Sequence, residues 1–138
     1  MTLKISREFV DAILEQSRDE YPDEACGVIL GPAGSGDAVR IKSMTNAAHS
    51  PTFYEFDPKD LLALYREVDD ANEEIVVIYH SHTDTEAYPS RTDIAYAGEP
   101  GAHYVLVSTR KAIAPEVEFR SFRIIDGEVK EEGVWITE

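Results

Sequence analysis

Apolar residues near the N-terminus recur at the spacing of a helix and are followed by strand-like runs. The helical pattern begins after Ser6, which can cap it, and ends before Pro22, because helices usually stop ahead of a proline. Its apolar face consists of Phe9, Val10, Ile13 and Leu14. The run 25–30 indicates a buried strand, and the glycines within 31–36 indicate a turn into a second strand over 39–43. We therefore expect a helix followed by a β-hairpin.

A second helix and a central strand are predicted in the middle of the chain. Asp57 can cap a helix that has Pro58 at its first position, where proline is well tolerated, and residues 53–56 before it fit a short strand. The apolar stripe of this helix consists of Leu61, Leu62, Leu64, Tyr65 and Val68. Residues 75–79 are β-branched and aromatic without alternation, which is typical of a central strand covered on both faces.

The last third of the chain completes a mixed pattern. Ser90 can open a short helix, residues 104–107 read as another strand, and Asp126 with Gly127 supplies the positive φ angles of a tight hairpin turn. Because helices and strands are interspersed, the expected fold class is α/β or α+β with a mixed β-sheet. The sequence contains no linker and no internal repeat, so we expect a single domain over 1–138.

Composition argues against several classes of function. The 138 residues include 27 acidic and 13 basic side chains, and the formal charge of -14 repels nucleic-acid phosphates and anionic lipids. We expect neither nucleic acid nor a membrane as a partner, and the acidity fits a basic partner or a salt-rich cytoplasm equally well. The only cysteine, Cys26, cannot form an intramolecular disulfide, and the N-terminus lacks a secretion-signal pattern. The expected location is therefore the cytoplasm.

Two histidines and an aspartate are spaced as metal ligands. His80 and His82 stand two residues apart at the end of the predicted central strand, so both imidazoles project from one side. Ser90 and Asp93 stand three residues apart at the start of the next helix and share a face. Two imidazoles and one carboxylate suit a catalytic Zn²⁺ ion, whose fourth tetrahedral position is left to water. The pattern His-x-His-x7-Ser-x2-Asp therefore indicates a hydrolytic site with one zinc ion.

Each half of this pattern also has a purely structural interpretation. Ser90 and Asp93 match a helix capping box, and a His-x-His pair by itself is more often structural or solvated than metal-binding. A hydrolytic site needs in addition a base for the water and a donor for the developing oxyanion. Glu24 and Ser90 are the candidates for these two roles, although nothing in the sequence places Glu24 beside the histidines.

Taken together, these residues resemble the JAMM, or MPN-plus, metallopeptidases. That family has an upstream glutamate followed by His-Ser/Thr-His-x7-Ser-x2-Asp, and residues 22–27 and 46–57 resemble its other motifs, so the match covers nearly the whole chain. The resemblance implies a mixed, curved β-sheet flanked by helices, which is the JAMM/MPN or cytidine-deaminase-like fold. It also implies the roles of five residues: zinc ligands His80, His82 and Asp93, water activator Glu24 and oxyanion donor Ser90.

One departure from the family pattern indicates a particular branch of the family. Many relatives have proline after the second histidine, where this chain has Thr83, and together with residues 50–54 and 103–110 this resembles an actinobacterial branch of the family. That branch releases newly made cysteine from the Gly-Gly C-terminus of a ubiquitin-like sulfur carrier, so the resemblance implies such a carrier as the partner. Two alternatives stay open: a broader isopeptidase that removes a ubiquitin-like modifier from lysine, and a non-catalytic scaffold, against which the complete ligand set argues.

Residues around the pattern carry weaker expectations. Ser81 and Thr83 flank the second histidine and are expected to orient the imidazoles through hydrogen bonds. Trp135 is expected to close the core near the C-terminus. Cys26 is expected to be a small buried apolar side chain and not a zinc ligand. His49 is expected to be exposed or capping in its loop, with a place beside a substrate channel as the alternative, and His103 is expected to be structural.

Overall fold

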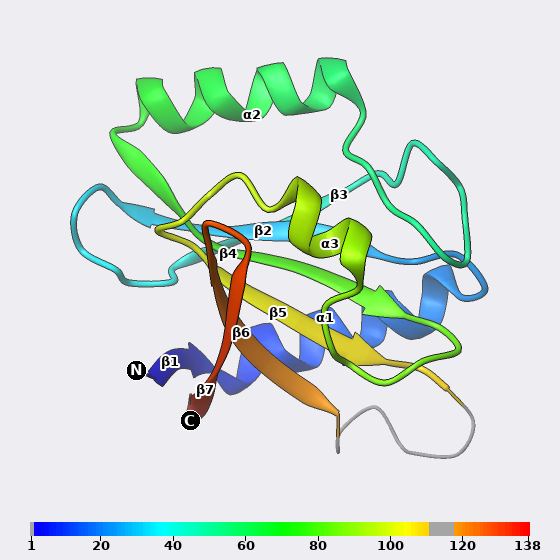
Figure 1. Ribbon diagram of the computed structural model, residues 1–138. Coiled ribbons are helices and arrows are strands. Elements are labelled where there is room, and N and C mark those ends of the chain that lie inside the picture. Colours follow the sequence, from blue (N-terminus) through cyan, green and yellow to red (C-terminus); the bar gives the residue numbers. More distant parts are fainter. Residues whose placement is uncertain (1, 111–117) are drawn as a thin grey trace.

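The computed structural model describes residues 2–110 and 118–138, which form three helices around a β-sheet (Figure 1). In chain order the elements are β1 (Thr2–Ser6), α1 (Arg7–Glu20), β2 (Cys26–Pro32), β3 (Arg40–Met44), α2 (Pro58–Asp70), β4 (Glu73–His82), α3 (Arg91–Tyr96), β5 (His103–Ser108), β6 (Phe119–Ile125) and β7 (Glu128–Thr137). The predicted class, helices interspersed with the strands of a mixed sheet, is confirmed.

The sheet has the strand order β1-β7-β6-β5-β4-β2-β3. The pairs β4–β5 and β1–β7 are parallel and the other neighbours are antiparallel. Figure 1 shows α1 behind the sheet and α2 and α3 on the opposite side. Since β4 lies between β2 and β5 and is covered on both faces, its long apolar run is explained.

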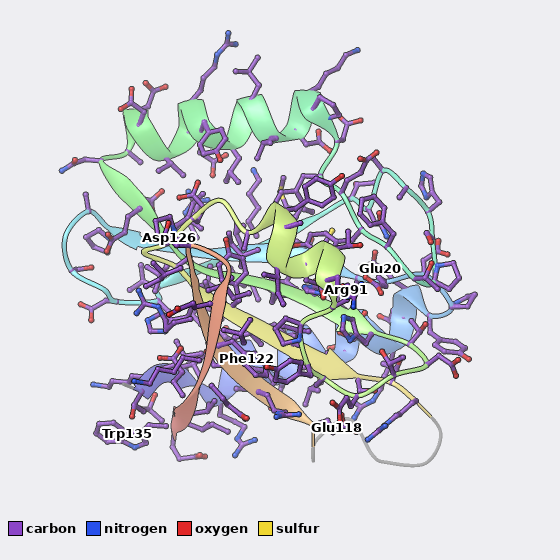
Figure 2. The ribbon with its side chains drawn as sticks, viewed as in Figure 1. Glu20, Arg91, Glu118, Phe122, Asp126 and Trp135 are labelled. Carbon is purple, nitrogen blue, oxygen red and sulfur yellow. The ribbon has the colours of Figure 1, made fainter. Side chains whose placement is uncertain are left out.

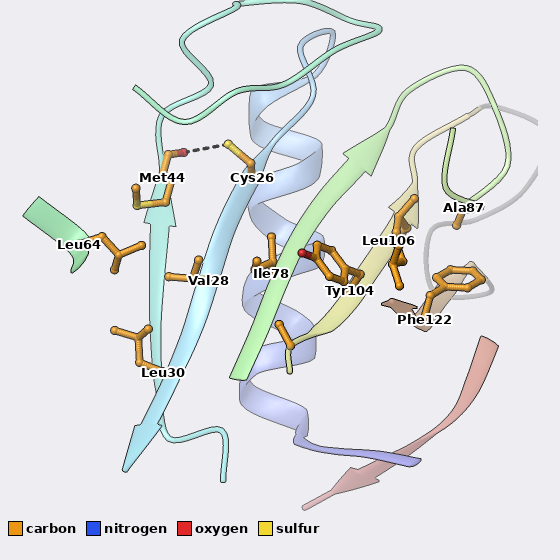
Figure 3. Close-up of a cluster of buried hydrophobic side chains, with 12 residues drawn as sticks. Cys26, Val28, Leu30, Met44, Leu64, Ile78, Ala87, Tyr104, Leu106 and Phe122 are labelled. Atoms are coloured by element: carbon orange, nitrogen blue, oxygen red, sulfur yellow. Dashed lines mark hydrogen bonds between the residues drawn. The ribbon is translucent and has the colours of Figure 1, made fainter. Parts of the chain in front are cut away.

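Two buried clusters hold the layers together. One packs α1 against the sheet and includes Val10, Ile13 and Leu14. The other lies on the face of α2 and α3, where Leu64 of α2 reaches the strands (Figure 3). Among the other side chains that Figure 3 labels on this face are Val28, Leu30, Met44, Ile78, Leu106 and Phe122.

A β-bulge in β4 shapes the pattern of its side chains. Ile29 of β2 pairs with Val77, but Leu30 pairs with Ile75, so Val76 is an extra residue in the ladder. Val76 and Val77 consequently both belong to the α1 cluster. Regular alternation from Val77 onward then sends every second side chain, beginning with Ile78, to the face of α2 and α3. The two histidines that end β4 follow Ile78 on that face.

The local start and turn signals of the sequence are confirmed. The side chain of Ser6 accepts a hydrogen bond from the backbone N–H of Phe9 at the start of α1. The carboxylate of Asp57 accepts two backbone hydrogen bonds at the start of α2. Asp126 and Gly127 adopt φ angles of 52° and 78° in the turn between β6 and β7. Each of these signals depends only on neighbouring residues, which is why the sequence contained it.

Parts of the secondary structure differ from what the sequence indicated. β1 was not predicted, because its five residues gain their order from parallel pairing with β7 at the far end of the chain. Residues 53–56 do not form a strand and make only one isolated bridge, between Asn46 and Phe56. In α2 only Leu64 is fully buried, and Leu62 and Tyr65 are about half exposed.

The expectation that Trp135 closes the core is wrong. Its side chain is 61% exposed, and Figure 2 shows it at the margin of the molecule. Strand alternation explains this, because Val134 and Ile136 on either side of it pack into the α1 cluster and turn Trp135 outward. The ammonium of Lys4 lies 5.3 Å from the centre of the Trp135 ring.

None of the helices in residues 2–110 and 118–138 has the length and apolar character needed to cross a bilayer.

Candidate metal centre

The end of β4 and the start of α3 bring three donor atoms together. Nε2 of His80 lies 3.3 Å from Nε2 of His82. Oδ2 of Asp93 lies 3.2 Å from Nε2 of His80 and 3.0 Å from Nε2 of His82. Both histidines are buried and the Asp93 side chain is largely so. The predicted residues therefore converge as a group that could hold a metal ion.

The spacing of these atoms fits a tetrahedral ion. Metal–ligand bonds of about 2.0 to 2.1 Å at tetrahedral angles hold neighbouring donor atoms roughly 3.3 Å apart. The measured separations of 3.0, 3.2 and 3.3 Å are close to that value. Three protein ligands leave one tetrahedral position for water, which is the arrangement of catalytic rather than structural zinc sites.

The capping box of α3 fixes the carboxylate of Asp93. The backbone N–H of Ser90 donates to Oδ2 of Asp93 at 2.8 Å, and the backbone N–H of Asp93 donates to Oγ of Ser90 at 3.1 Å. The structural interpretation of this pair is thus confirmed. It does not compete with the ligand interpretation, because the capped oxygen is the same Oδ2 that faces both imidazoles.

A backbone carbonyl orients the second imidazole. Nδ1 of His82 lies 2.8 Å from the carbonyl oxygen of Glu86 and 3.3 Å from Oγ1 of Thr85. Ser81 and Thr83 do not take this role, contrary to our expectation. Oγ of Ser81 instead accepts from the backbone N–H of Ala25 at 2.8 Å. The loop after β4 therefore supplies the partner that sets the ring, and no side-chain pattern in the sequence could indicate a backbone carbonyl in this role.

The first imidazole is held by stacking. The ring of Tyr54 lies against that of His80, with centroids 4.4 Å apart and an interplanar angle of 27°. Nδ1 of His80 is buried and has no hydrogen-bond partner within residues 2–110 and 118–138. Tyr54 was not singled out in the sequence, since an aromatic residue in a loop gives no sign of which buried ring it will meet.

The charges of the three side chains depend on one another. Burial opposes ionisation of Asp93, but hydrogen bonds from His80 and His82 outweigh it and hold the pKa of this carboxyl well below its usual range. Burial lowers the pKa of His80. Burial also acts to lower the pKa of His82, but its hydrogen bonds to Asp93 and to the Glu86 carbonyl raise it overall. An ionised carboxylate beside two imidazoles is the charge state that metal binding needs.

Pairing between β2 and β4 brings Glu24 to this centre. Cys26, the first residue of β2, pairs with His80, and Glu24 lies two residues before it, next to Ala25, which is hydrogen-bonded to Ser81 between the two histidines. The Glu24 side chain is buried, and burial raises its pKa to about 8, with the charge of His82 lowering it and that of Asp93 raising it. A carboxyl with a pKa near neutrality can take up and release a proton at physiological pH. Contacts between residues far apart in the chain place Glu24 beside the histidines, so the sequence alone could not predict this position.

The remaining candidates lie outside the centre. Cys26 is buried, and burial raises the pKa of its thiol to about 12, with the charges of Glu20 and Glu24 adding to the effect. It therefore packs as a small apolar side chain, as expected. His49 is exposed in the loop before α2. His103 lies 2.6 Å from a carboxylate oxygen of Glu132 on β7.

The fold and the three-ligand centre define a class of metal-dependent hydrolases. The sequence model described as prokaryotic homologs of the JAB domain matches residues 6–125 of the chain. The protein therefore belongs to the prokaryotic JAB family, and it is a hydrolase of the JAMM type, as the resemblance implied.

Curated relatives and solved structures agree with this assignment. The chain is 54% identical to a CysO-cysteine peptidase of Mycobacterium tuberculosis over 99% of its own length and 92% of that protein. It is 30% identical to a desampylase of Haloferax volcanii over 77% of this chain and 80% of that one. A solution structure from Desulfitobacterium hafniense superimposes with a TM-score of 0.82 at 26% identity, covering 100% of this chain and 94% of that one. A JAB1/MPN domain protein from Archaeoglobus fulgidus, 20% identical, shares the fold with a TM-score of 0.59 over 96% of this chain and 97% of its own.

Proposed function

We propose that this protein is a zinc-dependent peptidase that hydrolyses the amide bond after the C-terminal Gly-Gly of a ubiquitin-like sulfur carrier and releases cysteine. The observation that carries the proposal is the convergence of three ligand atoms within 3.3 Å beside a buried carboxyl, in a chain 54% identical to a CysO-cysteine peptidase. A cytoplasmic location accords with the free, buried thiol of Cys26.

Zn²⁺ is the ion that we assign to His80, His82 and Asp93. Two imidazole nitrogens and one carboxylate oxygen form a donor set typical of catalytic zinc, and their separations suit its bond lengths. When bound, zinc polarises a carbonyl and makes a water more acidic. The hydrogen bond from Nδ1 of His82 to the Glu86 carbonyl would leave Nε2 as the nitrogen available to hold the ion.

Glu24 is the proposed general base and acid. Its carboxylate accepts a proton from the attacking water, whose oxygen adds to the carbonyl carbon of the last glycine. As the carbon–nitrogen bond breaks, Glu24 returns this proton to the leaving amine, so the products are a carrier with a free carboxylate and the amino acid cysteine. The pKa of about 8 applies to the protein without an ion. A nearby dication favours the ionised carboxylate, as a base requires.

Ser90 is the proposed donor to the oxyanion. Its Oγ already accepts the hydrogen bond from the backbone N–H of Asp93. A hydroxyl can accept through its lone pairs and donate its own hydrogen at the same time, so capping leaves the O–H available. The exposed position of Ser90, at the N-terminus of α3 next to Asp93, is compatible with contact to a substrate.

The decisive test is intact-mass analysis of a carrier ending in Gly-Gly-Cys after incubation with the zinc-loaded protein. We expect the wild type to remove one cysteine, Glu24→Gln to leave the carrier intact over the same incubation, with at most a slow residual rate, and Glu15→Gln, which changes a carboxylate on the exposed face of α1, to match the wild type. Intact carrier after incubation with a wild type of confirmed zinc content would refute the proposed substrate.

A second candidate substrate is an isopeptide conjugate. The 30% identity to a desampylase favours it as the alternative. Presenting the enzyme with equal amounts of the cysteine adduct and of the same carrier joined to a lysine side chain separates the two. Preference for the lysine conjugate would make the broader isopeptidase the better description. The third alternative, a scaffold without activity, would require a purified protein that cannot bind zinc.

A further inference from the structure

The side chain of Asn46 uses all of its hydrogen-bonding capacity inside the protein. It is buried, and Nδ2 donates to the carbonyl oxygens of Glu24 and Phe53, each at 3.0 Å. Oδ1 accepts from the backbone N–H groups of Ala48 at 3.0 Å and Glu55 at 3.2 Å. An amide offers two donor hydrogens and two lone pairs, so every site is filled. Because one end meets only acceptors and the other only donors, the orientation of the amide is fixed.

One of these bonds reaches the residue that carries the proposed base. The backbone N–H of Glu24 donates to the carbonyl of Ser50 at 2.9 Å, and its carbonyl receives the bond from Asn46. Glu24 precedes β2, so no regular ladder holds it. Its backbone is instead fixed on one side by the segment 46–56, and Ala25 after it is bonded to Ser81, between the two histidines of β4.

The same segment is tied to the ligand strand at a second point. Oγ1 of Thr83, directly after His82, donates to the carbonyl of Pro51 at 2.7 Å. Segment 46–56 thus contacts both the backbone of Glu24 and Thr83, the residue directly after the strand that carries the two histidines. Asn46 also closes the segment on itself through Phe53 and Glu55. A change in this segment can therefore move Glu24 relative to the histidines.

We propose that Asn46 is a positioning residue for Glu24: its amide hydrogens fix the backbone that aims the Glu24 carboxyl into the metal centre. The inference rests on the proposed function, since it takes Glu24 as the base. The substitution Asn46→Asp would keep both accepting interactions and lose both donating ones, whereas Asn46→Ala would lose all four. Misplacing a catalytic group by about 1 Å can cost roughly 100-fold in rate.

The first test measures amide hydrogen exchange at Glu24 by NMR in the folded protein. Asn46→Ala and Asn46→Asp should each raise the exchange rate of the Glu24 N–H at least about tenfold, because local opening frees it from Ser50. Amides in the centre of β4, such as that of Ile78, should keep their protection. Asp57→Ala, which removes two backbone hydrogen bonds at the start of α2, is the matched control and should leave Glu24 unchanged.

The second test asks whether Asn46 acts through Glu24. In the wild-type background we expect Asn46→Asp to lower kcat by about 10- to 100-fold with the zinc content retained. In the Glu24→Gln background the same change should have little further effect on residual kcat, because there is no base left to misplace. A role limited to stability would lower kcat by the same factor in both backgrounds, and this outcome would overturn the proposal.

Failure of the proposed function is distinguishable from failure of this inference. If the wild type cleaves neither carrier substrate, the proposed function is wrong, and the exchange measurement still decides whether Asn46 holds Glu24. An unchanged Glu24 exchange rate in a folded Asn46 variant would overturn the positioning role, whichever substrate the enzyme cleaves.

Discussion

Nδ1 of His82 and the carbonyl oxygen of Glu86 are 2.8 Å apart. A carbonyl can only accept, so Nδ1 of His82 carries a hydrogen, and loss of the proton that Nε2 shares with Asp93 leaves the lone pair on Nε2. The loop between β4 and α3 therefore selects the form of the imidazole that can bind an ion. The ligand strand and the helix that supplies Asp93 are joined by a loop whose own backbone takes part in the site.

Asp93→Asn should abolish tight metal binding without unfolding the protein. The asparagine keeps an oxygen that can accept from the Ser90 N–H but removes the charged ligand. Affinity for Zn²⁺ should fall by more than about 100-fold, since even changes outside the ligand shell cost roughly 10- to 100-fold. Metal content after dialysis and the zinc-dependent rise in Tm measure this, with Asp84→Asn in the exposed loop as the control. A variant that still retains one equivalent of zinc would contradict the ligand assignment.

Ser90→Ala should separate catalysis from capping. We expect kcat to fall by about 100- to 1,000-fold through loss of the oxyanion donor, and stability to fall by about 1 kcal/mol through loss of the cap. Ser6→Ala removes the cap of α1 and should cost similar stability with no change in kcat. Equal kcat values for the two variants in a peptidase assay would show that Ser90 serves only the helix.

The raised pKa of Glu24 predicts a pH dependence of stability in the metal-free protein. Its folded pKa of about 8 lies above the reference value of 4.5, so the unfolded state releases this proton first as the pH rises. The contribution of Glu24 to the free energy of unfolding should therefore be fully present below about pH 4.5 and be lost as the pH rises through about 8. Urea unfolding of wild type and Glu24→Gln between these limits measures it. A constant difference between the two proteins would mean that the carboxyl titrates normally.

Gly27→Ala tests the close packing beneath the centre. A Cβ at Gly27 would overlap the hydroxyl oxygen of Tyr79, a buried residue whose O–H donates to Gln16 on α1. The ring must shift and lose that bond, so we expect a loss of about 1 to 3 kcal/mol in the free energy of unfolding. Gly98→Ala is the control, because its nearest neighbour, the carbonyl oxygen of Tyr96, would be 3.9 Å away. Equal stability of the two variants in urea would contradict the predicted clash.

The sequence revealed the parts of the fold and site that depend on near neighbours. Ser6, Asp57 and Ser90 were each predicted to begin a helix. In the structure each side chain caps its helix through a hydrogen bond to a backbone N–H two or three residues later. The two-residue spacing of His80 and His82 was enough to predict that both rings share a face.

What the sequence could not reveal depends on distant partners. β1 is ordered by β7, and the burial of Glu24 follows from strand pairing across more than fifty residues. The prediction that Trp135 closes the core was wrong because the type of this residue does not indicate which face of its strand is exposed. The hydrogen bond between His82 and the backbone carbonyl of Glu86 could not be predicted either, because every residue type has a backbone carbonyl.

The atom shared by the capping box and the metal centre links two equilibria. Oδ2 of Asp93 accepts from the backbone N–H of the cap residue Ser90 and faces both imidazoles, so an ordered α3 and an ion bound at this centre would stabilise each other. Such coupling is reciprocal. Any contact from outside that strengthens the first turn of α3 must raise the affinity for the ion by the same factor by which the ion favours that contact. Ion binding at the buried centre would therefore change the stability of α3, a helix of six residues at the protein surface.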